Sequence, residues 1–265
     1  FNVGWTVGIL GGQALAGYHY ALLGPRWALW TIALLVWANG LYLAWRTRHG
    51  MPAFVHAEGP DVSPHETLSV GRRAGYLRMA WIANFTLWFA GSAVGTVFPK
   101  LGRTLHFSDG LIGLLLSVTV LWQAISFAGL SRWSRWHYRL GPLVAAQVMA
   151  AGGLWLIAVQ PVSASILFGF ALLGLSRGLS YSCSLYYGLD GAAMRGVNSG
   201  IHEAIVGIAY ILGPLLAGFS ADLSGLRTPY LLCAIVVLLG VGVEGVLWRR
   251  LPAYTPPQEP APSRL

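Results

Sequence analysis

"ILGPLLAG", residues 211–218, places a proline between glycines in the middle of a long apolar run. A proline inside a helix removes one backbone hydrogen bond and clashes with the preceding turn, so the run predicts a helix with a kink at Pro214. A second run, "GILGGQALAG" at residues 8–17, has almost the same spacing of small residues. The two runs together indicate an internal repeat.

The composition is typical of an integral membrane protein. Of the 265 residues, 55% are hydrophobic and only 10% are charged, whereas soluble domains contain about 25% charged residues. Eight apolar runs approach the ~20 residues that a helix needs to cross a bilayer. The runs are residues 3–23, 27–45, 79–98, 110–130, 141–159, 164–188, 201–221 and 229–248. The sequence therefore predicts an all-α polytopic membrane protein with eight transmembrane helices in a lipid bilayer.

The formal net charge of +8 follows the predicted topology. Twelve arginines lie at helix ends or connections on one side of the membrane, and four basic residues lie on the other. Cytoplasmic connections have such an excess of Lys and Arg. We therefore expect both termini to be cytoplasmic, in the plasma membrane (a bacterial inner membrane), and we expect no nucleic-acid partner.

The two glycine runs align residue by residue, since Gly12–Gly17 matches Gly213–Gly218. They lie six predicted spans apart and enter the membrane from the same side, as in a transporter built from two six-helix halves. Small residues allow helices to approach closely, so we expect these runs to form a seam and hinge between the halves. The predicted seam residues are Gly8, Gly12, Gly17, Gly213, Pro214 and Gly218.

At these runs the sequence resembles the major facilitator superfamily, whose fifth helix often contains G-x-x-x-G-P-x-x-G-G. "GILGGQALAG" is similar to a weakened copy with Gln13 in place of Pro, and "GPLLAG" keeps the Gly213-Pro214 pair. "FSDGLIGLLLSV" resembles the entry to the eighth helix, and "MRGVNSGIHEAIVG" resembles the turn into the eleventh. "GLSRWSRWHYR" departs from the family loop G-x-x-x-D-R-x-G-R-R, because Trp133 replaces the Asp. The resemblance implies that the chain is a fragment, helices five to twelve, that lacks the first four helices.

The resemblance also implies a division of the chain. Residues 1–45 would be the last two helices of the N-terminal half, 46–78 the central cytoplasmic linker, 79–250 the C-terminal six-helix half and 251–265 a disordered cytoplasmic tail. The histidines and acids of the linker lack a recognised ligand spacing, so we expect no metal and no cofactor. Ser108 and Asp109 are typical of a helix start, here that of the fourth span.

Ionisable residues inside a membrane span are expensive and indicate functional sites. Arg177 lies mid-span on a face shared with Tyr181, which predicts an anion or carboxylate site; a structural ion pair or snorkelling to an interface is the alternative. Glu203, beside His202, would either carry a coupling proton or stabilise a helix start. Glu244 is expected to be structural, in a pair with an arginine such as Arg249.

Uncharged residues suit the wall of a path for an organic solute, although each alone is equally suited to helix packing. Asn84 and Trp88 lie four residues apart on the third span, Gln123 lies mid-span in the fourth, and Tyr210 lies one turn before Pro214.

These patterns predict a secondary active transporter that moves a small organic solute by alternating access, coupled to protons and acting as a monomer. The sequence shows no nucleotide-binding loop or catalytic motif, so we expect no enzymatic activity. Two alternatives remain open: a membrane sensor or scaffold on a transporter fold, and an intramembrane enzyme that uses His202 and Glu203.

Overall fold

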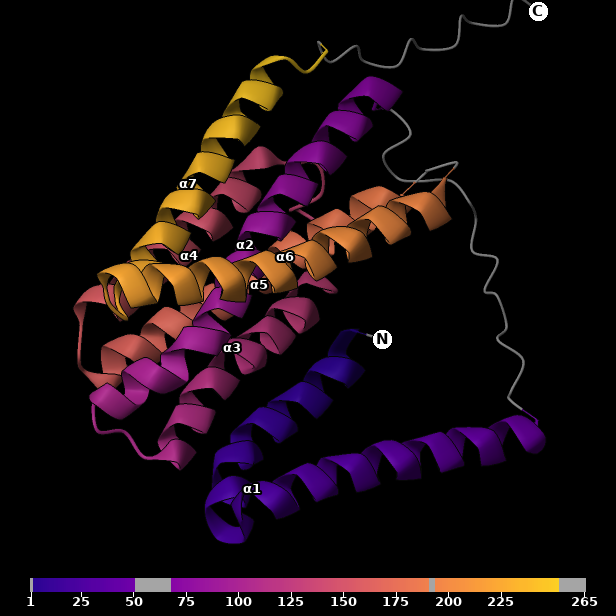
Figure 1. Ribbon diagram of the computed structural model, residues 1–265. Helices are drawn as coiled ribbons and strands as arrows, with labels where there is room; N and C mark the ends of the chain where they lie inside the picture. The colour runs from indigo at the N-terminus through magenta and orange to yellow at the C-terminus, as the bar shows by residue number, and fades with distance from the viewer. Residues whose placement is uncertain (1, 51–67, 191–193, 253–265) are drawn as a thin grey trace, which may run out of the picture.

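The computed structural model describes residues 2–50, 68–190 and 194–252. Most of the predicted linker and almost all of the predicted tail lie outside these residues. Within them all regular structure is helical (Figure 1). The helices are α1 (Asn2–Arg48), α2 (Val70–Thr104), α3 (Asp109–Leu130), α4 (Leu140–Val159), α5 (Ser163–Leu189), α6 (Arg195–Ser224) and α7 (Thr228–Arg249).

All seven helices contain a segment long and apolar enough to cross a membrane, which confirms the polytopic all-α fold. The predicted spans 3–23 and 27–45 are the two arms of α1, which meet at Gly24 and diverge in a V (Figure 1). Gly24 has φ 74° and ψ 172°, a conformation that favours glycine, and Pro25 then begins the second arm. Within α1, one segment of the described residues, Tyr18–Arg48, is long and apolar enough to cross a membrane. It contains the second predicted span and the end of the first.

α2 begins at Val70, within the predicted linker 46–78, whose role as a connection between the halves stays a prediction. Ser69 precedes the helix, and its hydroxyl accepts a hydrogen bond from the Arg72 N–H at 3.4 Å. This cap satisfies a backbone donor that the first helical turn leaves free, so α2 starts before its apolar span does.

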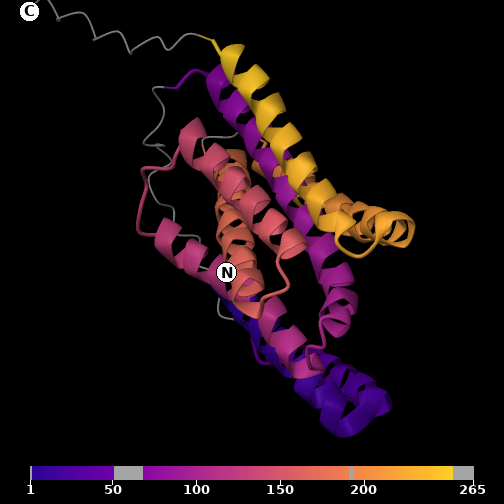
Figure 2. The same ribbon diagram turned by 90° about the vertical axis from the view of Figure 1, so that its left-hand side faces the viewer.

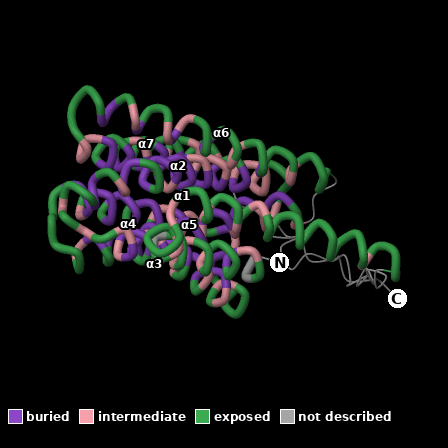
Figure 3. The backbone as a smooth tube through the Cα atoms, turned by 60° about the horizontal axis from the view of Figure 1, so that its bottom comes forward, coloured by how far each residue is buried: buried purple, intermediate pink, exposed green. Residues whose placement is uncertain are grey.

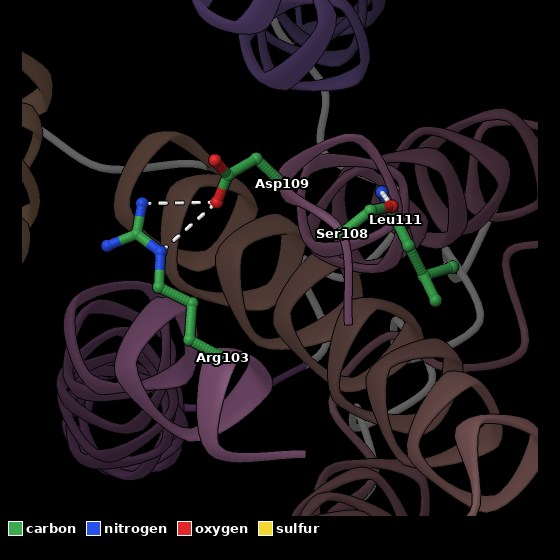
Figure 4. A network of polar contacts seen from close by, with 4 residues as sticks. All are labelled: Arg103, Ser108, Asp109 and Leu111. Carbon is green, nitrogen blue, oxygen red and sulfur yellow. Dashed lines mark hydrogen bonds and ion pairs between the residues drawn. The ribbon is translucent and has the colours of Figure 1, made fainter. Parts of the chain in front are cut away.

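The turn between α2 and α3 confirms the helix start predicted at Ser108 (Figure 4). The Ser108 hydroxyl accepts a hydrogen bond from the Leu111 N–H at 3.3 Å. Nε and Nη2 of Arg103, at the end of α2, each lie 3.1 Å from Oδ1 of Asp109. The cap and the ion pair together fix the direction in which α3 leaves α2.

α2 is the central helix of the bundle and packs against α5, α6 and α7, while α5 also packs against α3 and α4. Figure 2 shows α7 alongside α2. Buried positions gather where α2, α4 and α5 face one another, and the outward sides of α6 and α7 are exposed (Figure 3). A Cβ at Gly153 of α4 would lie 2.6 Å from the carbonyl oxygen of Gly169 on α5, so only glycines allow these two helices their close approach.

The two glycine runs do not meet within the described residues, where α1 packs mainly against α3, and α6 packs against α2, α5 and α7. A Cβ at Gly8, Gly12 or Gly218 would meet nothing within 4 Å. Gly213 instead packs closely against α2. Pro214 lies inside α6, which continues through it as one helix. Gly17 lies in the first arm of α1. The role of these residues as a seam and hinge stays a prediction.

Candidate functional site

Arg177 on α5 is buried, with 8% of its surface exposed. Its Cζ atom lies 4.1 Å from the ring centroid of Trp88 on α2, a cation–π arrangement. Gly91, three residues after Trp88, makes room for the guanidinium, since a Cβ there would lie 3.0 Å from it. The Tyr210 hydroxyl of α6 is close enough to interact with the guanidinium. Sequence analysis singled out Trp88, Arg177 and Tyr210 separately, and the structure brings them together.

The described residues offer Arg177 no carboxylate, and its Nε atom has no hydrogen-bond partner among them. The predicted alternative of a structural ion pair is therefore not found in this part of the chain. Snorkelling is not found either, because the side chain is buried among α2, α5 and α6.

Around Arg177 five aromatic residues from five helices form a cluster that we call the aromatic box. Ring centroids lie 5.8 Å apart for Trp88 and Tyr181, and 5.4 Å apart for Trp88 and Tyr210. Phe127 of α3 and Trp5 of α1 lie 5.6 Å and 6.2 Å from Tyr181. Neither Phe127 nor Trp5 was predicted from the sequence as a site residue. Phe127 is one turn from Gln123 on the same face, a spacing that could have revealed it, whereas nothing local distinguishes Trp5 from an interfacial tryptophan.

His202 on α6 lies next to the aromatic box and is only 1% exposed. Its ring centroid is 4.5 Å from that of Tyr181, and its Nδ1 atom is 2.7 Å from the Ser184 hydroxyl oxygen. Its Nε2 atom lies 4.0 Å from Oε1 of Glu203, whose side chain is 68% exposed. The imidazole thus lies between a buried tyrosine and an exposed carboxylate.

The predicted helix-start role of Glu203 is wrong. α6 begins at Arg195, so Glu203 lies in its third turn and the first turn contains no acidic residue. The helix dipole acts on charges within the first turn only, and Glu203 is beyond its reach.

Five of the eight predicted pathway residues have a buried polar atom with no hydrogen-bond partner among the described residues. An unpaired buried polar group costs about 1–3 kcal/mol, so such atoms are rare unless a ligand or a functional change explains them. Gln123 of α3 packs against α5, because its backbone carbonyl oxygen would lie 3.0 Å from a Cβ at Gly178. The atoms are Asn84 Nδ2 and Oδ1, Trp88 Nε1, Gln123 Nε2, Arg177 Nε and His202 Nε2.

Glu244 on α7 does not pair with Arg249, which corrects the suggested arginine partner. Its carboxylate is fully buried and accepts hydrogen bonds from Nε2 of Gln147 on α4, at 2.7 and 2.8 Å. Thr86 of α2 lies at the other end of the Gln147 amide, with its hydroxyl 3.5 Å from Oε1. Sequence analysis did not single out Gln147, since nothing local indicates which helix faces Glu244.

A pocket of about 260 Å³ lies between α1, α2 and α3, beside the Arg103–Asp109 ion pair. Its lining includes Gln13 and Tyr20 and none of the aromatic box. Among the described residues no group of three or more His, Cys, Asp or Glu could hold a metal ion.

Comparison with curated proteins found no match. The sequence profile of the Major Facilitator Superfamily matches residues 1–205, well over half of the 265-residue chain. The matched part contains α1 to α5 and the start of α6, and hence all of the aromatic box except Tyr210. With its helices of membrane-spanning length and this match, the chain belongs to the Major Facilitator Superfamily of membrane transporters.

Proposed function

We propose that the protein is a secondary active transporter that moves a small organic solute across the membrane by alternating access, coupled to protons. It acts as a monomer in the plasma membrane, a bacterial inner membrane, with both termini cytoplasmic and no enzymatic activity. The proposal is supported above all by one observation: the buried Arg177 guanidinium lies against Trp88, and Arg177 Nε and Trp88 Nε1 have no hydrogen-bond partner among the described residues.

The solute path follows the faces of α2, α3, α5 and α6 that converge on Arg177. Trp88 and Tyr181 are buried, whereas Tyr210 at the edge of the box is 49% exposed. A solute therefore enters beside Tyr210 when the two halves of the transporter rock about the site. Such rocking of one half against the other around a fixed central site is the basis of alternating access.

The coupling proton uses His202 and Glu203. The exposed Glu203 carboxylate collects a proton near the surface, and the buried imidazole 4.0 Å away receives it. Histidine changes charge near physiological pH and suits this transfer. Because His202 contacts Tyr181, a change in its charge acts directly on the wall of the solute site.

The test uses the full-length protein in liposomes with an imposed pH gradient and a pH-sensitive dye inside. Addition of a transported solute is expected to produce proton flux, and His202→Gln is expected to abolish gradient-driven accumulation but retain solute exchange at equal pH. His49→Gln, at an exposed histidine near the end of α1, serves as the matched control. If no solute in a broad panel moves in either direction, the transporter proposal fails and a sensor or scaffold role replaces it.

A further inference from the structure

We infer that the solute is an organic anion, specifically a monocarboxylate with a flat aromatic body. Its carboxylate binds Arg177, and its ring lies in the aromatic box. The inference rests on the proposed function, because it assigns a substrate class to the same site.

The first argument is the charge balance around Arg177. Five acidic residues lie in the described part of the chain, and the other interactions of four of them are known. Asp109 pairs with Arg103, Asp190 with the Tyr138 hydroxyl, Glu203 with His202 and Glu244 with Gln147. Asp222, the fifth, is exposed. Within the described residues the buried guanidinium therefore has no counter-ion, and an isolated buried charge is strongly unfavourable unless a partner neutralises it.

The second argument is the type of unpaired atom at that charge. Arg177 Nε and Trp88 Nε1, on the ring that the guanidinium covers, can only donate hydrogen bonds. A ligand that satisfies these atoms must be rich in acceptors. A carboxylate has two acceptor oxygens, and the planar fork of a guanidinium matches their geometry.

The third argument is the shape of the surroundings. Trp88 covers one face of the guanidinium at 4.1 Å, so a carboxylate approaches in the guanidinium plane. Trp88 in turn contacts Tyr181 and Tyr210, and aromatic rings favour offset or edge-on contact with another ring. A single negative charge suffices, because Arg177 is the one Lys or Arg buried in the described helices.

The test measures binding and needs no gradient. The full-length protein in lipid nanodiscs is titrated with benzoate and indole-3-acetate, and with benzamide and indole-3-acetamide as neutral counterparts of the same shape. Binding is followed by the shift of the thermal unfolding midpoint and by isothermal calorimetry. Each carboxylate is expected to bind about tenfold or more tightly than its amide, because charge-assisted hydrogen bonds are roughly twice as strong as neutral ones.

Substitutions show which residues produce the preference for carboxylates over amides. Arg177→Gln is expected to abolish the preference for the carboxylate, and Arg177→Lys to reduce it, because Lys keeps the charge but lacks the planar fork. Trp88→Leu is expected to weaken benzoate binding more than acetate binding. Arg249→Gln, at an exposed arginine of α7, is the control and leaves the preference unchanged.

The inference is overturned if carboxylates and amides bind equally to the unaltered protein, if neither binds, or if inorganic phosphate or acetate binds as well as benzoate. It is also overturned if a folded Arg177→Gln protein keeps the preference. Failure of the proposed function gives a different pattern: carboxylates bind with the expected preference, but no solute crosses a liposome membrane. Flux of an uncharged solute without carboxylate binding supports the function and refutes the inference.

Discussion

Gly213→Ala tests the closest contact between α6 and α2. A Cβ at Gly213 would lie 2.5 Å from the Phe89 carbonyl oxygen and 3.2 Å from the Ala93 nitrogen, and it would overlap the Ser92 hydroxyl. That hydroxyl donates a hydrogen bond from α2 to the Ala209 carbonyl oxygen of α6 at 2.9 Å.

The expected loss of stability follows from these distances. Ordinary contact begins at 3.4 Å, so the new methyl group is 0.9 Å too close to a backbone atom that cannot rotate away. Overpacking of this kind costs about 1–3 kcal/mol, and loss of the Ser92 hydrogen bond adds about 1 kcal/mol. Alanine recovers up to about 1 kcal/mol through its higher helix propensity. The net expectation is a destabilisation of about 2 kcal/mol.

The assay is thermal or denaturant unfolding of the full-length protein in one detergent. Gly207→Ala is the matched control, because it lies on the same helix and a Cβ there meets nothing within 4 Å. It is expected to be neutral or slightly stabilising, so the two substitutions differ in sign. Equal midpoints for Gly213→Ala and Gly207→Ala would refute the packing argument. A double variant with Ser92→Gly should recover part of the loss, since the clash with the hydroxyl is then absent.

Three further substitutions test other contacts. Gln147→Leu leaves the buried Glu244 carboxylate without its donor and is expected to cost about 3 kcal/mol in unfolding free energy. Glu244→Gln keeps a polar pair and is expected to cost less. Equal losses for the two variants would show that the contact is unimportant. Ser108→Ala removes the cap of α3 and is expected to cost about 1 kcal/mol, seen as faster amide exchange in its first turn, while Ser108→Asn behaves as wild type. Tyr138→Phe removes the hydroxyl that donates a hydrogen bond to Asp190 at 2.8 Å. The expected cost is about 1 kcal/mol in unfolding free energy, with faster proteolysis of the loop between α3 and α4. An unchanged rate of proteolysis would contradict this prediction.

Features that depend on neighbours in the chain could be predicted from the sequence. The membrane helices follow from apolar runs, and the start of α3 follows from Ser108, whose partner lies three residues away. Arg177 could be identified because one charge in an apolar run is exceptional wherever the helix packs. The break between the predicted spans 3–23 and 27–45 could be predicted as well, because Gly24, with its non-helical backbone, and Pro25 lie between the two helical arms of α1.

Features that depend on the pairing of distant helices could not be predicted. Gln147 and Glu244 lie 97 residues apart, and only the register of α4 against α7 brings them together. Trp5 joins the aromatic box because α1 packs on α3, a contact that no local pattern encodes. The same limit explains why the helix-start role of Glu203 is wrong, because the apolar run begins six residues after the helix itself.

The two glycine runs show how a repeated pattern and a repeated environment differ. Their shared spacing predicts a common topology, and the family match, over residues 1–205, contains the first of the two runs. Yet Gly213 has a Ser hydroxyl and a backbone carbonyl against it, whereas Gly8 and Gly12 meet open space. At Gly213 the absence of a side chain is required, because α2 and α6 could not otherwise bring Trp88 and Tyr210 to within 5.4 Å of each other. The glycine in "ILGPLLAG" therefore sets the helix spacing at the proposed solute site: a change that separates α6 from α2 is expected to move Tyr210 away from Trp88 in the aromatic box.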